Sequence, residues 1–221
     1  MCGRLQIAQP DLITTWLRQR GVFVAPELEV LQPRYNVAPT LAVPVLLSSA
    51  AGELRGGTMT WGLLPFWSKT KARHANARSE TVWEKPTFRG SVNRRRCVLL
   101  ANAFYEWHRD DKDKPVQAFH IPRRDGAPLA IAAIWDWSVD KSVGEVCLLT
   151  TSPNDTMAPI HDRMPCLLDD AGIALWLEST SPKHDLMPLL EPTPNEWLSP
   201  SLVSNFVNNV RNDGPSCIAT L

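Results

Sequence analysis

The chain of 221 residues begins Met-Cys-Gly-Arg, so Cys2 becomes the amino-terminal residue once Met1 is removed. Methionine aminopeptidases generally remove the first methionine when the second side chain is small. Cys2 would then carry an α-amine and a thiol on adjacent carbons. An aldehyde can condense with such an amine to an imine, and the thiol can then close a five-membered thiazolidine ring. The reference pKa of an α-amine is about 8, so neutral amine is available at pH 7.

Composition narrows the class of protein. Hydrophobic residues make up 44% of the chain and charged residues 21%, which is typical of a globular domain. Since no apolar run is long enough to cross a bilayer and the start lacks a signal pattern, we expect a cytoplasmic, nucleoid-associated protein without a membrane partner. The five cysteines form no C-x-x-C pair and no metal-ligand spacing occurs. We therefore expect neither a disulfide framework nor a metal or cofactor.

Charge is balanced overall, with 23 Lys+Arg against 23 Asp+Glu, but it is distributed unevenly. One region is strongly basic, and only Glu80 and Glu84 oppose it. Its basic residues are Lys69, Lys71, Arg73, Arg78, Lys85, Arg89, Arg94, Arg95 and Arg96. Such a region can attract a polyanion, although from charge alone an ordinary solvated surface is the better interpretation.

The apolar pattern predicts an α+β fold. Helices are expected from Pro10 to a stop at Gly21, from Asp169 through Glu178, and near Lys183–Leu190. Strands are expected at Val43–Leu47, Arg96–Ala101, Val116–Ile121, Leu129–Ile134 and Val146–Thr151. Because strands and helices do not alternate regularly, we expect a single domain over residues 1–221, with a largely antiparallel sheet or open barrel flanked by a few helices.

Seven motifs follow one another along the chain. They are Met1-Cys-Gly-Arg4, Arg34-Tyr-Asn-Val-Ala-Pro39, Trp61-Gly-Leu-Leu-Pro-Phe-Trp67, Asn76-Ala-Arg-Ser-Glu-Thr81, Phe104-Tyr-Glu-Trp107, Ile160-His-Asp-Arg-Met-Pro165 and Val207-Asn-Asn-Val-Arg-Asn-Asp-Gly214. In this order the set resembles the SRAP family, the SOS-response-associated peptidases. The resemblance implies an enzyme that senses abasic sites in single-stranded DNA and forms a thiazolidine DNA–protein crosslink during the DNA damage response. It also implies a peptidase activity, chiefly the removal of residues ahead of the cysteine.

The resemblance implies a catalytic set of Cys2, Asn76, Glu106 and His161. Cys2 would be the nucleophile, Asn76 would hold its backbone or amine, and His161 would give and take protons. Glu106 would transfer protons, because partial burial among aromatic side chains raises a carboxyl pKa. Strand alternation alone favours a different interpretation, a solvent-facing Glu106 with its two aromatic neighbours on the opposite face.

The resemblance also implies a set of DNA-binding residues. Arg78 and Arg163 would bind the phosphates beside the lesion, with Arg4 close by, because the guanidinium fork suits phosphate oxygens. Trp67 would stack on a neighbouring base, although core packing is the common role of tryptophan. The remaining members are Asn36 and Pro39 at the pocket floor and Thr150 near the lesion. Asn209 and Asn212 are expected to be turn residues that close the site, without a chemical role.

The chain departs from the family pattern in two places. Ser68 stands where some members carry a second aromatic residue after the Trp67 equivalent, which puts a two-ring wedge at a duplex junction in doubt. Ala103 replaces a glycine that is common before Phe-Tyr-Glu-Trp. This second change matters only if the position requires a positive φ.

Three other functions remain open from sequence. An amino-terminal-nucleophile amidohydrolase of the glutaminase type also starts Met-Cys-Gly, but the later motifs have no place in it. A non-covalent single-strand binder would leave Cys2 unused. A protease acting on other proteins lacks a recognisable triad or metal site. The preferred partner is single-stranded DNA with abasic sites, including single/double-strand junctions, bound by a monomer.

Overall fold

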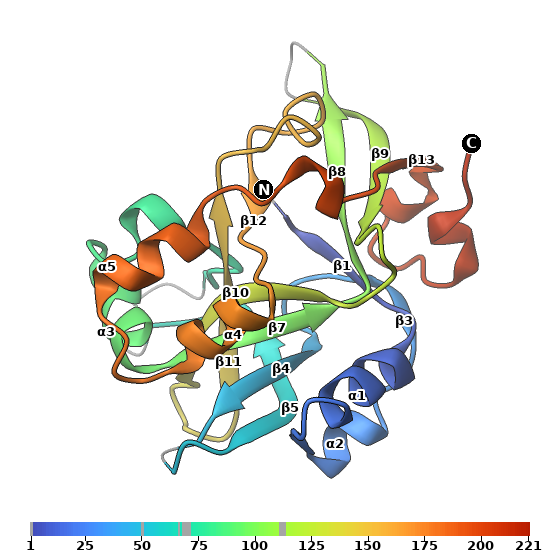
Figure 1. Cartoon of the computed structure of the whole chain (residues 1–221). Coiled ribbons are helices and arrows are strands. Elements are labelled where there is room, and N and C mark those ends of the chain that lie inside the picture. Colours follow the sequence, from blue (N-terminus) through green and yellow to red (C-terminus); the bar gives the residue numbers. More distant parts are fainter. Residues whose placement is uncertain (1, 50, 66, 68–71, 111–113) are drawn as a thin grey trace.

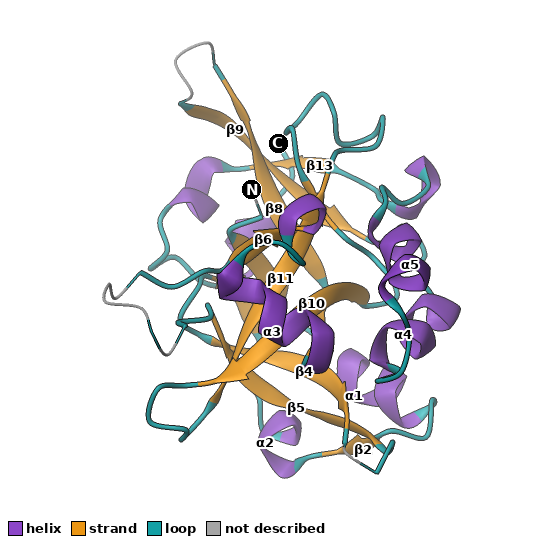
Figure 2. Ribbon diagram, turned by 90° about the vertical axis from the view of Figure 1, so that its left-hand side faces the viewer, coloured by secondary structure: helices purple, strands orange, loops and turns teal. Residues whose placement is uncertain are grey.

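The computed structural model describes residues 2–49, 51–65, 67, 72–110 and 114–221. It shows an α+β fold with two β-sheets and short helices outside them, as the sequence predicts (Figures 1 and 2). The smaller sheet has five strands, and the larger one has eight.

The larger sheet forms a barrel. Its barrel strands are β4 (Ala42–Ser48), β5 (Leu54–Trp61), β7 (Arg96–Ala101), β10 (Leu129–Trp137) and β11 (Gly144–Thr151). Neighbours in the order β11-β10-β7-β4-β5 are antiparallel, and a parallel pairing of β5 with β11 closes the ring. The predicted open barrel is thus closed by the parallel pair. Three short strands join the same sheet: β2 (Phe23–Val24), β6 (Asn76–Arg78) and β12 (Met164–Pro165).

The smaller sheet is antiparallel throughout, in the order β13-β9-β8-β1-β3. Its strands are β1 (Arg4–Ile7), β3 (Arg34–Val37), β8 (Ala103–Arg109), β9 (Pro115–Pro122) and β13 (Ser201–Val203). Phe104 of β8 belongs to the main core, whereas Tyr105 packs with Val203, Val207 and Cys217 in a second cluster. Because both faces of β8 are covered, alternate side chains on this strand are buried on either side.

The helices lie outside the sheets (Figure 2). The α-helices are α1 (Pro10–Arg18), α2 (Pro26–Glu29), α3 (Pro86–Arg94), α4 (Asp170–Leu177) and α5 (Lys183–Leu186). Proline at the first turn of α1, α2 and α3 fits a position whose N–H has no helical acceptor. Asp169 begins α4 by accepting the N–H of Gly172 at 2.7 Å. Within the described residues, no helix has the length and apolar character needed to span a membrane.

The basic region between positions 69 and 96 is not one continuous surface. Arg96 is buried, and its guanidinium donates to main-chain carbonyls at the ends of α3 and α4. Arg73 binds Glu145, and Arg95 binds Asp136. These three arginines therefore have roles within the fold. Two lysines of the region, Lys69 and Lys71, lie outside the described residues.

Candidate active site

Cys2 lies two residues before β1 with none of its surface exposed. The Asn76 amide nitrogen donates to the Cys2 carbonyl oxygen at 2.8 Å. Asn76 is placed by the short parallel pairing of β6 with β11, in which it aligns with Leu148. Its side-chain oxygen is buried and accepts no hydrogen bond from the described residues. The structure therefore places the Asn76 amide beside the Cys2 backbone and leaves the Asn76 side-chain oxygen available to accept a hydrogen bond.

Glu106 lies in the middle of β8 and is 2% exposed. The solvent-facing alternative is wrong, because β8 is covered on both faces. Burial raises the pKa of Glu106 from its ordinary 4.5 to about 7, since water no longer stabilises the carboxylate. Burial also raises the pKa of the Cys2 thiol, and the negative charge of Glu106 adds to this rise. The pair thus combines a carboxyl group that exchanges protons near neutrality with a thiol that stays protonated.

His161 follows a tight turn in which its N–H bonds to the Met157 carbonyl at 2.9 Å. Its Nε2 lies 3.9 Å from Glu106 Oε2. Its Nδ1 is 3.0 Å from the Arg163 main-chain N–H and 2.8 Å from Asp162 Oδ1. A neutral ring accepts the Arg163 N–H, and a protonated ring can donate to Asp162 instead. Because both forms of the ring have a neighbour at Nδ1, His161 can exchange protons on its Nε2 side, facing Glu106.

A cavity of about 520 Å³ opens beside His161. Its walls are Trp107, His108 and Arg109 at the end of β8, and residues 158–162. An outside ligand in this cavity would contact His161, whose ring faces Glu106, whereas Glu106 itself does not line the cavity.

Arg4 and Asn36 bind a segment near the carboxyl terminus. Arg4 Nη1 donates to Asn36 Oδ1 at 2.7 Å and to the Val207 carbonyl at 2.9 Å. Asn36 is buried, and its amide nitrogen lies within 3.1 Å of the carbonyl oxygens of Val207, Asn209 and Asn212. These contacts join the two strands flanking the site to the segment 207–213. A phosphate at Arg4 would have to use the rest of its guanidinium.

Arg163 and Thr150 form a second internal cluster. The Arg163 guanidinium binds both carboxylate oxygens of Glu80, at 2.6 and 2.9 Å, and the Thr150 carbonyl at 2.5 Å. Its hydrogen bonds lower the pKa of Glu80. The Thr150 side chain is fully buried. A phosphate approaching Arg163 would therefore share the guanidinium with Glu80 or displace that carboxylate.

Two other predicted DNA-binding residues face solvent. Trp67 is 54% exposed, which core packing would not produce. Arg78 is exposed on β6, two residues beyond Asn76, and forms no ion pair with any described carboxylate. Pro39 is half-buried after β3. Ser68 lies outside the described residues, and Ala103 sits in the regular strand β8 without a positive φ. The missing glycine at Ala103 is thus of no structural consequence.

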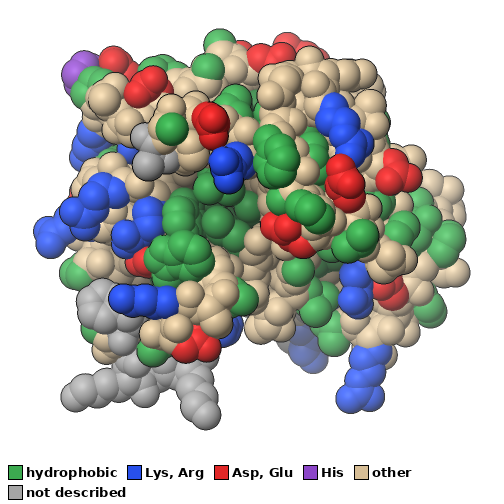
Figure 3. Space-filling view, turned by 90° about the horizontal axis from the view of Figure 1, so that it is seen from below, with side chains coloured by type: hydrophobic (Ala, Val, Ile, Leu, Met, Phe, Trp, Pro, Cys, Tyr) green, Lys and Arg blue, Asp and Glu red, His purple; other side chains and the backbone are tan. Residues whose placement is uncertain are grey.

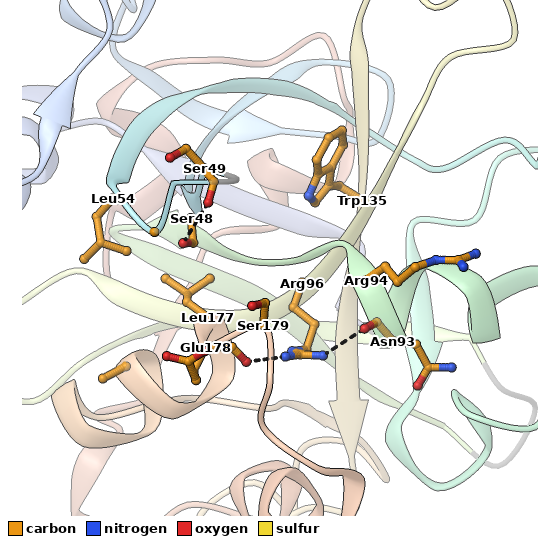
Figure 4. A pocket seen from close by; sticks show the side chains of 12 residues that line it. Ser48, Ser49, Leu54, Asn93, Arg94, Arg96, Trp135, Leu177, Glu178 and Ser179 are labelled. Atoms are coloured by element: carbon orange, nitrogen blue, oxygen red, sulfur yellow. Dashed lines mark hydrogen bonds between the residues drawn. The ribbon is translucent and has the colours of Figure 1, made fainter.

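A second cavity, of about 510 Å³, lies between the β4–β5 hairpin, α3 and α4 (Figure 4). Arg94 and Trp135 line it, while the buried Arg96 donates to the carbonyls of Asn93 and Glu178. Viewed from below, the molecule is hollowed and hydrophobic side chains line the hollow (Figure 3). No residue of the seven motifs lines the second cavity, so the chemistry is assigned to the site around Cys2.

Comparison with known proteins identifies the family of this chain. The model of the SOS response associated peptidase (SRAP) family matches residues 1–210. The chain belongs to the SRAP family. The abasic site processing protein YoqW of Bacillus subtilis (strain 168) is 34% identical over 228 residues, covering 99% of each chain. The abasic site processing protein HMCES of Xenopus tropicalis is 33% identical over 225 residues, covering 86% of this chain and 67% of that relative.

Solved structures support the SRAP fold. A crystal structure of a Bacteroides thetaiotaomicron protein superimposes with a TM-score of 0.84 at 22% identity, over 100% of both chains. This similarity concerns the fold alone.

Sequence reasoning missed two acidic residues that form ion pairs with arginines of this SRAP chain. Glu80 binds Arg163, and Glu145 binds Arg73. Glu80 carried a signal, because it is one of two acids within the basic region. Glu145 carried no such signal, because a glutamate next to an apolar strand is commonly exposed.

Proposed function

We propose that this SRAP protein processes abasic sites in single-stranded DNA by forming a thiazolidine crosslink through Cys2, after Met1 is removed. The observation that carries the proposal is the placement of Cys2 next to Asn76 and a buried Glu106 with a pKa of about 7. The relatives YoqW and HMCES are abasic site processing proteins.

The reaction consumes one amine, one aldehyde and one thiol, and it releases one water. The Cys2 amine attacks the aldehyde carbon of the ring-opened sugar and forms a carbinolamine. Glu106, protonated, donates to the leaving hydroxyl, so that water departs and an iminium ion forms. The Glu106 carboxylate then takes back the nitrogen proton, which leaves the imine and restores the acid. The thiol then adds across the C=N bond: sulfur bonds to carbon and the thiol proton ends on nitrogen. A thiol kept neutral by burial suits this last step, because it brings its own proton.

Asn76 and His161 support this sequence. The Asn76 amide holds the Cys2 carbonyl, and its free side-chain oxygen can accept a hydrogen from the Cys2 amine, directing the nitrogen lone pair outward. His161 can take the proton of the sugar hydroxyl and return one to the ring oxygen, which opens the closed sugar to its aldehyde. Glu106 lies within reach to restore the protonation of the imidazole.

DNA binding is divided between two groups of residues. Arg78 and Trp67 face solvent, so we propose that they contact a phosphate and a base beside the lesion. The second group forms the walls that support the site: Arg4, Asn36, Pro39, Thr150 and Arg163. Arg4 and Arg163 can offer DNA only those N–H donors that are not already bonded to their internal partners. No cofactor takes part in the proposed reaction.

Intact mass spectrometry tests the proposal directly. The protein is mixed with a single-stranded oligonucleotide that contains one abasic site, and the product is denatured. We expect a mass equal to the protein without Met1 plus the oligonucleotide minus one water. Cys2→Ala should give no such product, whereas Cys147→Ala, which removes a buried thiol in β11, should still give it. Adduct formation by Cys2→Ala would refute the assignment.

We also propose that the chain processes itself at Met1, consistent with the peptidase description of its family. Glu106 would then be required for removal of Met1 as well as for crosslinking. Expression of Glu106→Gln in cells lacking methionine aminopeptidase activity toward this terminus should yield protein that keeps Met1, whereas the unsubstituted protein loses it. Equal loss of Met1 from both proteins would exclude self-processing by Glu106.

A further inference from the structure

Glu145 at the start of β11 is 1% exposed, and its carboxylate joins two separate chain segments. One oxygen accepts the main-chain N–H of Leu64 at 2.7 Å. The other accepts from Arg73 Nη1 at 2.5 Å, and the same Nη1 donates to the Gly62 carbonyl at 2.9 Å. A buried carboxylate is costly without such partners, so this arrangement fixes both segments to the barrel.

Main-chain contacts hold the same two segments together. Leu63 and His74 exchange hydrogen bonds of 3.0 and 2.8 Å, and the Gly62 N–H donates to the Val146 carbonyl at 2.8 Å. Gly62 has a φ of +119°, and a Cβ there would lie 3.2 Å from the Cβ of Arg73. Glycine at this position therefore permits both the backbone turn and the close approach of Arg73.

The clamped segments lead to Trp67, which lies three residues after Leu64. We infer that Glu145 is a positioning residue: its pairing with Arg73 orients the segment carrying Trp67, so that the indole can stack on a base beside the abasic site. The inference rests on the DNA-binding role proposed above for Trp67. It assigns to the buried Glu145 a part in DNA affinity that this side chain could not have through contact with DNA.

Asn76 does not depend on this clamp in the same way. It is aligned by the pairing of β6 with β11, where Leu148, Leu149 and Thr150 provide the register. Loss of the Glu145–Arg73 pair should therefore weaken DNA binding while leaving the chemical step at Cys2 intact. A general loss of structure would affect both.

The experiment is a double-substitution cycle between Glu145→Gln and Trp67→Ala. Affinity is measured with a single-stranded oligonucleotide carrying a tetrahydrofuran, which lacks the aldehyde and cannot crosslink. The crosslinking rate is measured at saturating abasic oligonucleotide, and folding is checked by thermal unfolding. Asp136→Asn is the matched control, because Asp136 lies opposite Glu145 on β10 and pairs with Arg95, away from Trp67. Arg73→Gln is a second variant that breaks the clamp from its partly exposed side.

We expect Trp67→Ala to weaken affinity about fivefold or more, the lower end of base stacking. Glu145→Gln and Arg73→Gln should each weaken it about threefold or more, with the saturated crosslinking rate within about twofold of the unsubstituted protein. In the Trp67→Ala background Glu145→Gln should have no further effect. Asp136→Asn should leave affinity unchanged.

Each contrary result has a distinct meaning. Full affinity in Glu145→Gln and Arg73→Gln, or an equal loss in the Trp67→Ala background, would overturn the positioning role while leaving the proposed function in place. Full affinity in Trp67→Ala would overturn the stacking role and the inference with it. Absence of crosslinking by the unsubstituted protein would instead refute the proposed function.

Discussion

Substitution of Glu106 by glutamine should change both the pH dependence of crosslinking and the pH dependence of stability. Burial places the pKa of Glu106 at about 7, against an ordinary 4.5. Glutamine keeps the shape of the side chain but can neither release nor take up the proton. If protonated Glu106 drives the departure of water, the rate of the unsubstituted protein falls as pH rises through 7. The variant should be slower by roughly 10²–10⁴-fold at neutral pH and lack this fall.

The stability effect can be worked out from the same pKa. Between pH 4.5 and about 7 the unfolded chain carries ionised Glu106, whereas the folded chain keeps it protonated. The folded state binds more protons in this window, so the free energy of unfolding decreases as pH rises. At about 1.4 kcal/mol for each pKa unit, the change amounts to about 3 kcal/mol. Glu106→Gln lacks this loss, so it should gain stability relative to the unsubstituted protein across the window.

Two assays measure these effects. Single-turnover crosslinking at saturating abasic oligonucleotide, followed on denaturing gels from pH 5.5 to 8.5, gives the rate profile. Urea unfolding of both proteins at pH 4.5, 6 and 7.5 gives the difference in stability, in which contributions from other groups cancel. A stability difference that stays constant with pH would refute the raised pKa. An unchanged rate profile in the variant would remove Glu106 from the proton transfer.

Three further substitutions test other parts of the site. Asn76→Ala, which loses the 2.8 Å hydrogen bond to the Cys2 carbonyl, should slow crosslinking about tenfold or more at unchanged affinity for tetrahydrofuran DNA, as measured by rate and binding together. Arg78→Ala should reduce the slope of log affinity against log salt by about 0.7, whereas Arg18→Ala on α1 should leave it unchanged in the same titration. Arg163→Ala should lower the free energy of unfolding by about 1–3 kcal/mol, because hydrogen bonds to Glu80 and Thr150 are lost. Because Arg163 holds the pKa of Glu80 below its ordinary 4.5, the effect of Arg163→Ala measured by urea unfolding should shrink as the solution is acidified below that pH.

Apolar runs predicted four of the five barrel strands, because these strands are buried along most of their length. The strand β5 was not predicted, since its sequence Leu-Arg-Gly-Gly-Thr-Met-Thr-Trp contains two glycines and no apolar run. The expected strands at Arg96–Ala101 and Leu129–Ile134 coincide with β7 and most of β10. The helix α3 escaped prediction, since Pro86–Arg94 contains Gly90 and little apolar periodicity. Its stability comes from tertiary packing of Phe88 and Val92, which no local pattern shows.

The site was harder to predict from residues alone. The alternation of Tyr105, Glu106 and Trp107 favours an exposed carboxylate. Glu106 instead shares the face of Phe104, which packs in the main core, because a second layer on the opposite face of β8 buries Tyr105. That layer comes from residues about a hundred positions away, such as Val207. The positions of Cys2, Asn76 and His161 followed from the family motifs. Their mutual distances depend on strand pairing between distant segments, which a single sequence does not reveal.

The attachment of Arg4 and Asn36 to residues 207–213 has a consequence for biosynthesis. On the ribosome the first residues emerge long before that segment exists, so Cys2 stays accessible to processing enzymes during most of translation. Once the late segment docks, Arg4, two residues after Cys2, is held by the Val207 carbonyl. Order of synthesis thus gives processing enzymes an early period in which to remove Met1, whereas the proposed self-processing by Glu106 has to wait until the pocket is assembled.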